Sequence, residues 1–177
     1  MRSNHPWLYM QLLICTVCGI YGRQEKLLFS TSTKVKEVDM DTGVVKELAN
    51  HSSSVYSIAY DVKERYVYFP RLHENVIERF FYPIDENVTF EIVVSTIRPF
   101  YVAFDSENSH LYWTEYTSSG KIMRSNSDGS SLTTIINEHK PVALALDTHN
   151  SKRVEYRLHN YSINQTSKRE DFRTAGY

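Results

Sequence analysis

Short apolar segments separated by polar turns recur along the chain at a regular interval. Three of these segments share an aspartate at their last position: SIAYD (57–61), YVAFD (101–105) and ALALD (143–147). The aspartates return about every 43 residues. An apolar-aromatic segment follows the first two, VYF (67–69) and LYW (111–113), and LLF (27–29) occupies the same place upstream. The hydrophobic pattern therefore predicts a repeated unit.

Each period continues in the same order after its aromatic strand. Polar residues lead to a second strand, then to an aspartate-containing turn, and then to a further apolar strand. The turns are DMDTG (39–43), YPIDEN (82–87) and SNSDGS (125–130). One period thus holds four short strands, and about 40–45 residues with four strands is typical of a β-propeller blade. The alternative is an all-β sandwich with evenly spaced strands, but a sandwich does not repeat a four-strand motif.

The third copy carries a family resemblance. LYWTE (111–115), followed by KIMRSNSDGSSLTTII and KPVALALD, resembles the Tyr-Trp-Thr-Asp (YWTD) signature of low-density-lipoprotein-receptor class B repeats. Weaker copies cover 27–66 and 67–110. The sequence departs from the signature at Glu115, which replaces Asp, and at Phe69 and Pro70, which replace Trp and Thr. The resemblance implies a six-bladed propeller in a receptor ectodomain or a basement-membrane protein.

The length sets the expected domain organisation. Six blades of about 43 residues need roughly 260 residues, whereas the chain has 177. We therefore predict an all-β, incomplete YWTD-type propeller, from a fragment or truncated form: three blades over 23–154 and an incomplete fourth repeat over 155–177. Because RVEYRLHNYSINQTSKREDF (153–172) is poor in aliphatic and rich in charged residues, we expect its outer strands not to form.

The N-terminus reads as a signal peptide over residues 1–22. Arg2 precedes an apolar stretch over 7–20, and Gly19 or Gly22 supplies a small residue for cleavage. The alternative is a buried N-terminal strand or helix. Cys15 and Cys18 form a CxxC pair inside this stretch, but nothing downstream completes a zinc set, so we expect no redox or metal role.

Secretion agrees with the other features of the sequence. Four Asn-x-Ser/Thr sequons predict glycosylation at Asn50, Asn87, Asn160 and Asn164. The formal net charge of −1 gives no basic excess to attract nucleic acid. No second hydrophobic stretch offers a membrane span. We expect a protein that is secreted or lies on the extracellular side of the plasma membrane.

Catalytic and metal-binding motifs find little support. DMDTG begins like a calcium loop, but Gly43 and Asn50 stand at the fifth and twelfth positions, where the motif needs Gly at the sixth and Glu at the twelfth. The histidines are dispersed, and no nucleophile elbow or phosphate loop is found. We therefore expect a turn at 39–43, no cofactor and no enzymatic activity. Asp61, Asp105 and Asp147 are interpreted as turn residues, and Trp113 as an aromatic packed between blades.

The resemblance suggests where a ligand binds. Two loops of each repeat, one after the aromatic strand and one before the aspartate-ended strand, are expected to meet on one face, and loops usually carry binding. The candidate residues of this ligand face are Tyr56, Arg71, His73, Glu74, Arg98, Phe100, Glu115, Tyr116, His139 and Lys140. Tyr, Phe and Arg dominate interface hot spots.

The predicted function is extracellular ligand binding by a propeller that resembles the N-terminal propeller of a lipoprotein-receptor-related protein. Such a receptor is endocytic or a Wnt co-receptor, so the expected partner is a Wnt-pathway or lipoprotein-type ligand. Two alternatives stay open. One is a nidogen-like structural protein of the basement membrane. The other is a metal-dependent six-bladed propeller hydrolase.

Overall fold

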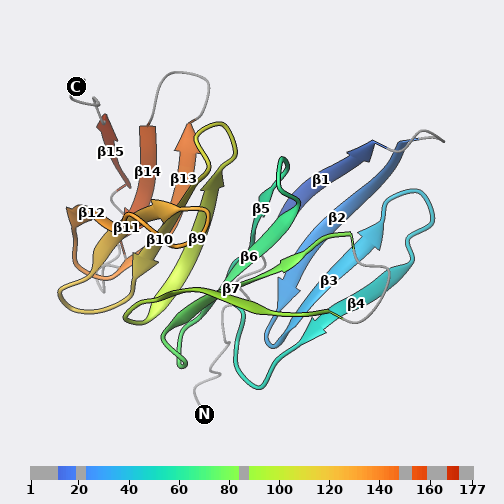
Figure 1. Ribbon diagram of the computed structural model, residues 1–177, viewed down its shortest axis with the longest axis horizontal. Helices are drawn as coiled ribbons and strands as arrows, with labels where there is room; N and C mark the ends of the chain where they lie inside the picture. The colour runs from blue at the N-terminus through green and yellow to red at the C-terminus, as the bar shows by residue number, and fades with distance from the viewer. Residues whose placement is uncertain (1–11, 19–22, 84–87, 148–152, 159–166, 172–177) are drawn as a thin grey trace, which may run out of the picture.

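The chain folds into antiparallel sheets that stand side by side (Figure 1). The computed structural model describes residues 12–18, 23–83, 88–147, 153–158 and 167–171, with the side chains of 25–83 and 88–146. Strands, turns and irregular linkers make up these ranges, and none of them contains a helix. Within the same ranges, no helix is long and apolar enough to cross a membrane.

Each sheet follows the order of its strands in the chain, so we call the sheets blades 1 to 4. Blade 1 contains β1 (Leu12–Cys18), β2 (Arg23–Thr31), β3 (Lys34–Asp39) and β4 (Val45–Asn50). Blade 2 contains β5 (Ala59–Asp61), β6 (Tyr66–Arg71), β7 (Val76–Phe81) and β8 (Glu91–Ser95). Blade 3 contains β9 (Pro99–Asp105), β10 (His110–Glu115), β11 (Lys121–Asn126) and β12 (Thr133–Asn137). Blade 4 contains β13 (Pro141–Asp147), β14 (Arg153–Leu158) and β15 (Ser167–Asp171).

The first strands of successive blades adjoin one another, β1 with β5, β5 with β9, and β9 with β13. Meandering four-stranded sheets whose first strands line one side are the arrangement of a β-propeller. The predicted all-β class and the four strands per period are therefore confirmed.

The blades begin one strand earlier than the sequence repeat. Each aspartate-ended strand pairs with the aromatic strand that follows it, so that Asp61 faces Tyr66 and Asp105 faces His110. The short connection explains this pairing, because a tight turn joins antiparallel neighbours. The aspartate at this turn is therefore a better guide to where a blade's strands pair than the aromatic signature.

Both ends of the described chain form strands. Leu12–Cys18, within the predicted signal peptide, forms β1 and pairs with β2. The signal peptide and its alternative, a buried N-terminal strand, both stay predictions. Cys18 is the last residue of β1, as Asp61 is of β5. At the other end, the expected boundary at residue 154 falls within β14, and a third strand, β15, does form. The backbone hydrogen bonds of a strand do not depend on aliphatic side chains.

The core lies between the blades, because alternate residues of a strand face opposite sides of its sheet. Val67 and Phe69 of β6 pack towards blade 1, whereas Tyr68 packs towards blade 3. In β10, Leu111 and Trp113 face blade 2 and Tyr112 faces blade 4. Trp113 is completely buried, which confirms its interpretation as an interblade aromatic.

The recurring aspartates close the turns. Asp61 accepts a hydrogen bond from the backbone N–H of Lys63 at 3.0 Å, and Asp105 accepts one from that of Glu107 at 3.0 Å. Asp39 accepts the N–H groups of Asp41 and Thr42 at 3.1 and 2.8 Å. Hydrogen bonding to Thr42 holds the pKa of Asp39 below its usual value. These carboxylates serve the turns, as predicted.

Blades 2 and 3 are also fastened at their outer strands. The Ser127 carbonyl, in the turn between β11 and β12, accepts hydrogen bonds from Tyr68 Oη at 3.2 Å and Arg79 Nη1 at 3.1 Å. Gly129 of the same turn has φ +85° and lies against β8, where a Cβ atom would stand 2.0 Å from the Val93 carbonyl oxygen. Only glycine fits this contact without moving one blade from the other.

Candidate ligand-binding face

The predicted loops meet at one end of blades 2 and 3. Glu115 at the end of β10 lies opposite Pro99 and Lys121 in the register, which places the β10–β11 loop beside the linker before β9. The Tyr116 N–H donates to the Arg98 carbonyl at 2.9 Å. The β6–β7 loop joins the same linker, because the Thr96 N–H donates to the Asn75 carbonyl at 2.8 Å. We call this end of the blades the loop face.

Three aromatic rings form a row along the loop face. The Tyr56 and Phe100 ring centroids lie 4.8 Å apart, and those of Phe100 and Tyr116 lie 5.1 Å apart. The rings come from the linker before blade 2, from the start of β9 and from the residue after β10. Phe100 in the middle is 8% exposed, and both tyrosines are half-buried. The row therefore combines a packed centre with accessible outer rings.

Arg98 lies beside this aromatic row. It has φ 46°, in the left-handed region, and its N–H donates to Asn75 Oδ1 at 2.9 Å. The side chain is anchored by one hydrogen bond from Nε to the Tyr116 carbonyl at 3.2 Å, and the residue is exposed. A guanidinium held next to a tyrosine is a combination enriched at protein interfaces.

Arg71 has a different place from the one expected. It is 6% exposed and its guanidinium is turned into its own chain, against His51 Nδ1 at 2.6 Å, Glu74 at 2.8 Å and Glu78 at 3.2 Å. Glu74 is exposed and also accepts from Ser53 Oγ at 2.8 Å. His73 of the same loop is exposed. Arg71 thus organises the β6–β7 loop, and Glu74 and His73 form its outer surface.

Arg71 also affects a half-buried histidine. His51 packs against Phe69 and Phe90, with ring centroids 4.9 and 4.7 Å away. Burial and the positive charge of Arg71 lower the pKa of His51 to about 4. The ring is neutral at neutral pH and accepts through Nδ1, because a guanidinium can only donate.

Glu115 is likewise buried, at 7% exposure. Its Oε1 accepts from Thr96 Oγ1 at 2.6 Å and from the Ile97 N–H at 3.4 Å. Thr96 Oγ1 in turn accepts from the Trp113 indole at 2.9 Å. One hydroxyl therefore connects the signature tryptophan to the signature carboxylate and ties β10 to the linker before its blade.

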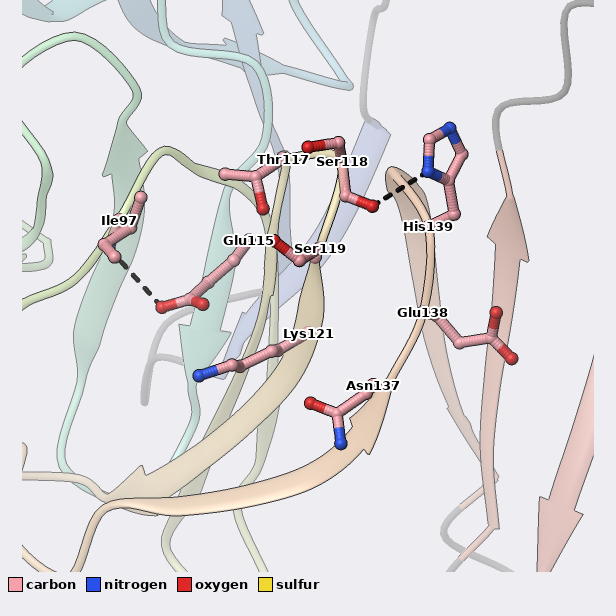
Figure 2. Close-up of a pocket in the computed structure, with 10 residues that line it drawn as sticks. Ile97, Glu115, Thr117, Ser118, Ser119, Lys121, Asn137, Glu138 and His139 are labelled. Atoms are coloured by element: carbon pink, nitrogen blue, oxygen red, sulfur yellow. Dashed lines mark hydrogen bonds between the residues drawn. The ribbon is translucent and has the colours of Figure 1, made fainter.

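Glu115 opens onto a hollow of about 720 Å³ in blade 3 (Figure 2). The β10–β11 loop, the loop after β12, Ile97 and Lys121 form its wall. His139 Nδ1 donates to the Ser118 carbonyl at 2.8 Å across the hollow, and the Lys140 N–H donates to the Thr117 carbonyl at 3.1 Å. The two loops are therefore held together at the rim.

One of the four predicted glycosylation sites lies within the described residues. Asn50 is exposed at the end of β4, whereas Asn87, Asn160 and Asn164 lie outside the described residues. The described part of the chain holds no group of three or more His, Cys, Asp or Glu side chains that could bind a metal ion.

The sequence analysis missed His51, Ser53 and Thr96. The first two form hydrogen bonds with Arg71, and Thr96 forms one with Glu115. A polar residue in each linker ahead of the aspartate-ended strand was the available signal.

Comparison with known proteins supports the fold. No protein-family model matches the chain, and no curated protein matches its sequence. The solved structure of a nidogen/laminin complex matches with a TM-score of 0.67 at 17% identity, covering 74% of this chain and 51% of that one. A gluconolactonase from Xanthomonas campestris matches at 0.63 and 14% identity, covering 76% and 51%. Hydrazine synthase from Kuenenia stuttgartiensis matches at 0.64 and 13% identity, covering 82% and 42%.

These similarities support a β-propeller fold. At such low identity they show the fold alone, and this chain spans about half of the nidogen and gluconolactonase chains.

Proposed function

We propose that this chain is a segment of an extracellular propeller that binds a protein ligand on its loop face. The observation that carries the proposal is the row Tyr56–Phe100–Tyr116 with Arg98 beside it. Partly exposed aromatic rings around a packed centre, with charged residues at the rim, suit a protein interface. The sequence resemblance favours a lipoprotein-receptor-related ectodomain and a Wnt-pathway or lipoprotein-type ligand. The likeness to nidogen in a laminin complex also supports an extracellular binding role.

The test measures binding of the full chain to immobilised Wnt-pathway ligands, lipoproteins and laminin. Tyr116→Ala and Arg98→Ala should each weaken binding by about 2 kcal/mol or more, as truncation of a hot spot does. Val62→Ala is the matched control, because Val62 is 64% exposed at the opposite end of blade 2. Full affinity in both loop-face variants, with unchanged melting temperature, would contradict the proposal.

The choice of ligand separates the receptor role from a second candidate. The nidogen likeness favours a basement-membrane protein, and binding to laminin but not to receptor ligands would select it. The proposal is one of binding and not of catalysis. Hydrolysis of a lactone in the presence of a divalent cation would instead favour the enzymatic alternative, to which the gluconolactonase likeness draws attention.

A further inference from the structure

The acid that lines the hollow of blade 3 has no ion-pair partner among the described residues, whereas the residue at the same position of blade 2 is a base that pairs with two acids. Glu115 and Arg71 are the last residues of the second strands of their blades. Each follows by five residues the strand residue that pairs with the turn aspartate, His110 or Tyr66. In blade 2 the guanidinium of Arg71 meets Glu74 and Glu78 at 2.8 and 3.2 Å. Blade 2 thus has a guanidinium at the position of Glu115, and this guanidinium pairs with two acids of the same blade.

The side chain of Glu115 is held in position through only one of its two carboxylate oxygens. Both of its hydrogen bonds reach Oε1, and no described residue donates to Oε2. The residue lines the hollow, and its carboxylate is drawn in Figure 2 with one oxygen towards Ile97. An acceptor of a buried charged group gains more from a donor than an exposed one does.

The nearest basic residue in the register does not supply that donor. Lys121 lies opposite Glu115 on β11 and lines the same hollow. Nevertheless, the ion pairs among the described residues do not include one between Glu115 and Lys121. The ammonium of Lys121 therefore leaves the carboxylate open to a group that enters the hollow.

We propose that this hollow binds the guanidinium of an arginine side chain presented by the partner polypeptide. A guanidinium has five N–H donors in a planar fork, and it can bond Glu115 Oε2 while it donates to the loop oxygens of the rim. The volume of about 720 Å³ lies within the range of ligand pockets and leaves space for residues that flank the arginine. The inference rests on the proposed function, since it names what the ligand places at the loop face.

The probe for this site is the blocked peptide acetyl-Gly-Arg-Gly-amide, titrated into the isotope-labelled full chain and followed by amide NMR shifts. We expect millimolar affinity, in keeping with a single ion pair, and shifts confined to 115–121 and 137–139. The same peptide with citrulline, which has the shape of arginine without its charge, should bind at least about tenfold more weakly.

Two variants make the test specific to the site. Glu115→Gln removes the charge but keeps an oxygen for Thr96, and it should abolish the preference for arginine over citrulline. Ser119→Trp fills the hollow from its exposed rim and leaves the carboxylate intact, so it should block the peptide even if the Gln variant folds poorly. Glu107→Gln is the matched control, because Glu107 is exposed on the β9–β10 turn at the other end of the blade.

Equal binding of the arginine and citrulline peptides, or unchanged binding in both site variants, would overturn the inference. The result is separable from the proposed function. If Tyr116→Ala weakens a protein ligand while the arginine peptide does not bind, the loop face stands and the guanidinium site falls. If the peptide binds as expected while Tyr116→Ala and Arg98→Ala leave every protein ligand unaffected, the guanidinium site stands without the proposed interface.

Discussion

The junction between blades 1 and 2 and the junction between blades 2 and 3 solve one structural problem with opposite charges. In both, the last residue of the blade's second strand is buried and bonds the linker that precedes the blade. Arg71 donates to His51 and Ser53, whereas Glu115 accepts from Thr96 and Ile97. The negative charge of the signature acid is therefore not required at this position. The position needs a polar group that reaches the linker, and the linker supplies the complementary partner.

The opposite charges have different consequences for the rest of each junction. The guanidinium draws in Glu74 and Glu78 and keeps His51 neutral. The Glu115 carboxylate accepts from Thr96 Oγ1, the same hydroxyl to which the Trp113 indole donates, and it borders the hollow of blade 3. Both junctions have an apolar core. A closed network of charges lies at the edge of the core in junction 1–2, and one anchored acid lies at the edge of the core in junction 2–3.

The largest effect is expected at the aromatic residue that fills each junction. Trp113→Ala and Phe69→Ala each remove a completely buried ring, so each should lower the free energy of unfolding by about 3–5 kcal/mol. Trp113→Phe should add a difference between the junctions, because only Trp113 donates a hydrogen bond, to Thr96. Urea unfolding of the full chain measures both. A Trp113→Ala variant as stable as Val62→Ala would refute the interblade role.

The next effect concerns the closed network of charges. Arg71→Met leaves Glu78 partly buried without its cation and should cost about 2–3 kcal/mol, below the value for a fully buried pair because Glu74 and Glu78 retain access to water. The double variant Arg71→Met, Glu78→Gln should recover part of the loss. A single variant with wild-type stability in urea would show that the guanidinium does not hold the junction.

The pH dependence of stability distinguishes the same network. Because the folded pKa of His51 is about 4 and the ordinary value is 6.5, the unfolded chain takes up a proton first as the pH falls. Stability is then lost progressively from about pH 6.5 down to pH 4, by at most about 1.4 kcal/mol per pH unit for one proton. His51→Asn keeps an acceptor for Arg71 and should flatten this contribution. Parallel unfolding curves of the two proteins across that range would contradict the assignment.

The smallest effect is expected at the anchored acid of junction 2–3. Glu115→Gln keeps an oxygen for Thr96 and removes only the charge, so unfolding should change by less than about 1 kcal/mol. The smaller loss of stability than in Arg71→Met would show that charge matters more at junction 1–2 than at junction 2–3. A loss as large as that of Arg71→Met would mean that both junctions depend equally on charge.

The sequence predicted the blades because their signals are local and repeated. Asp61 and Asp105 close turns with their own neighbours, and Trp113 stands in a short apolar strand, so both were readable from spacing. The start of each blade was misplaced because the aromatic signature is more conspicuous than the turn that pairs its strand with the one before. β1 was ambiguous for a physical reason, since an apolar run of that length suits either a secretion signal or a strand.

The candidate site was only partly predictable. The Tyr56–Phe100–Tyr116 row follows from the expectation that two loops of each repeat share a face, although its role in binding remains a prediction. The burial of Arg71 and Glu115 was not foreseen, because their partners His51 and Thr96 lie about 20 residues earlier in linkers that carry no pattern of their own. Such contacts depend on the packing of one blade against the next and not on spacing within a strand.

Gly129 sets how closely the outer strands of blades 2 and 3 approach each other. There is no room for a Cβ atom between Gly129 and the Val93 carbonyl, so any side chain at this position would act as a wedge between the two blades. Such a wedge would increase the angle between blades 2 and 3 and would weaken the packing of their outer strands. One small residue far from the loop face thus helps to set the angle between blades 2 and 3.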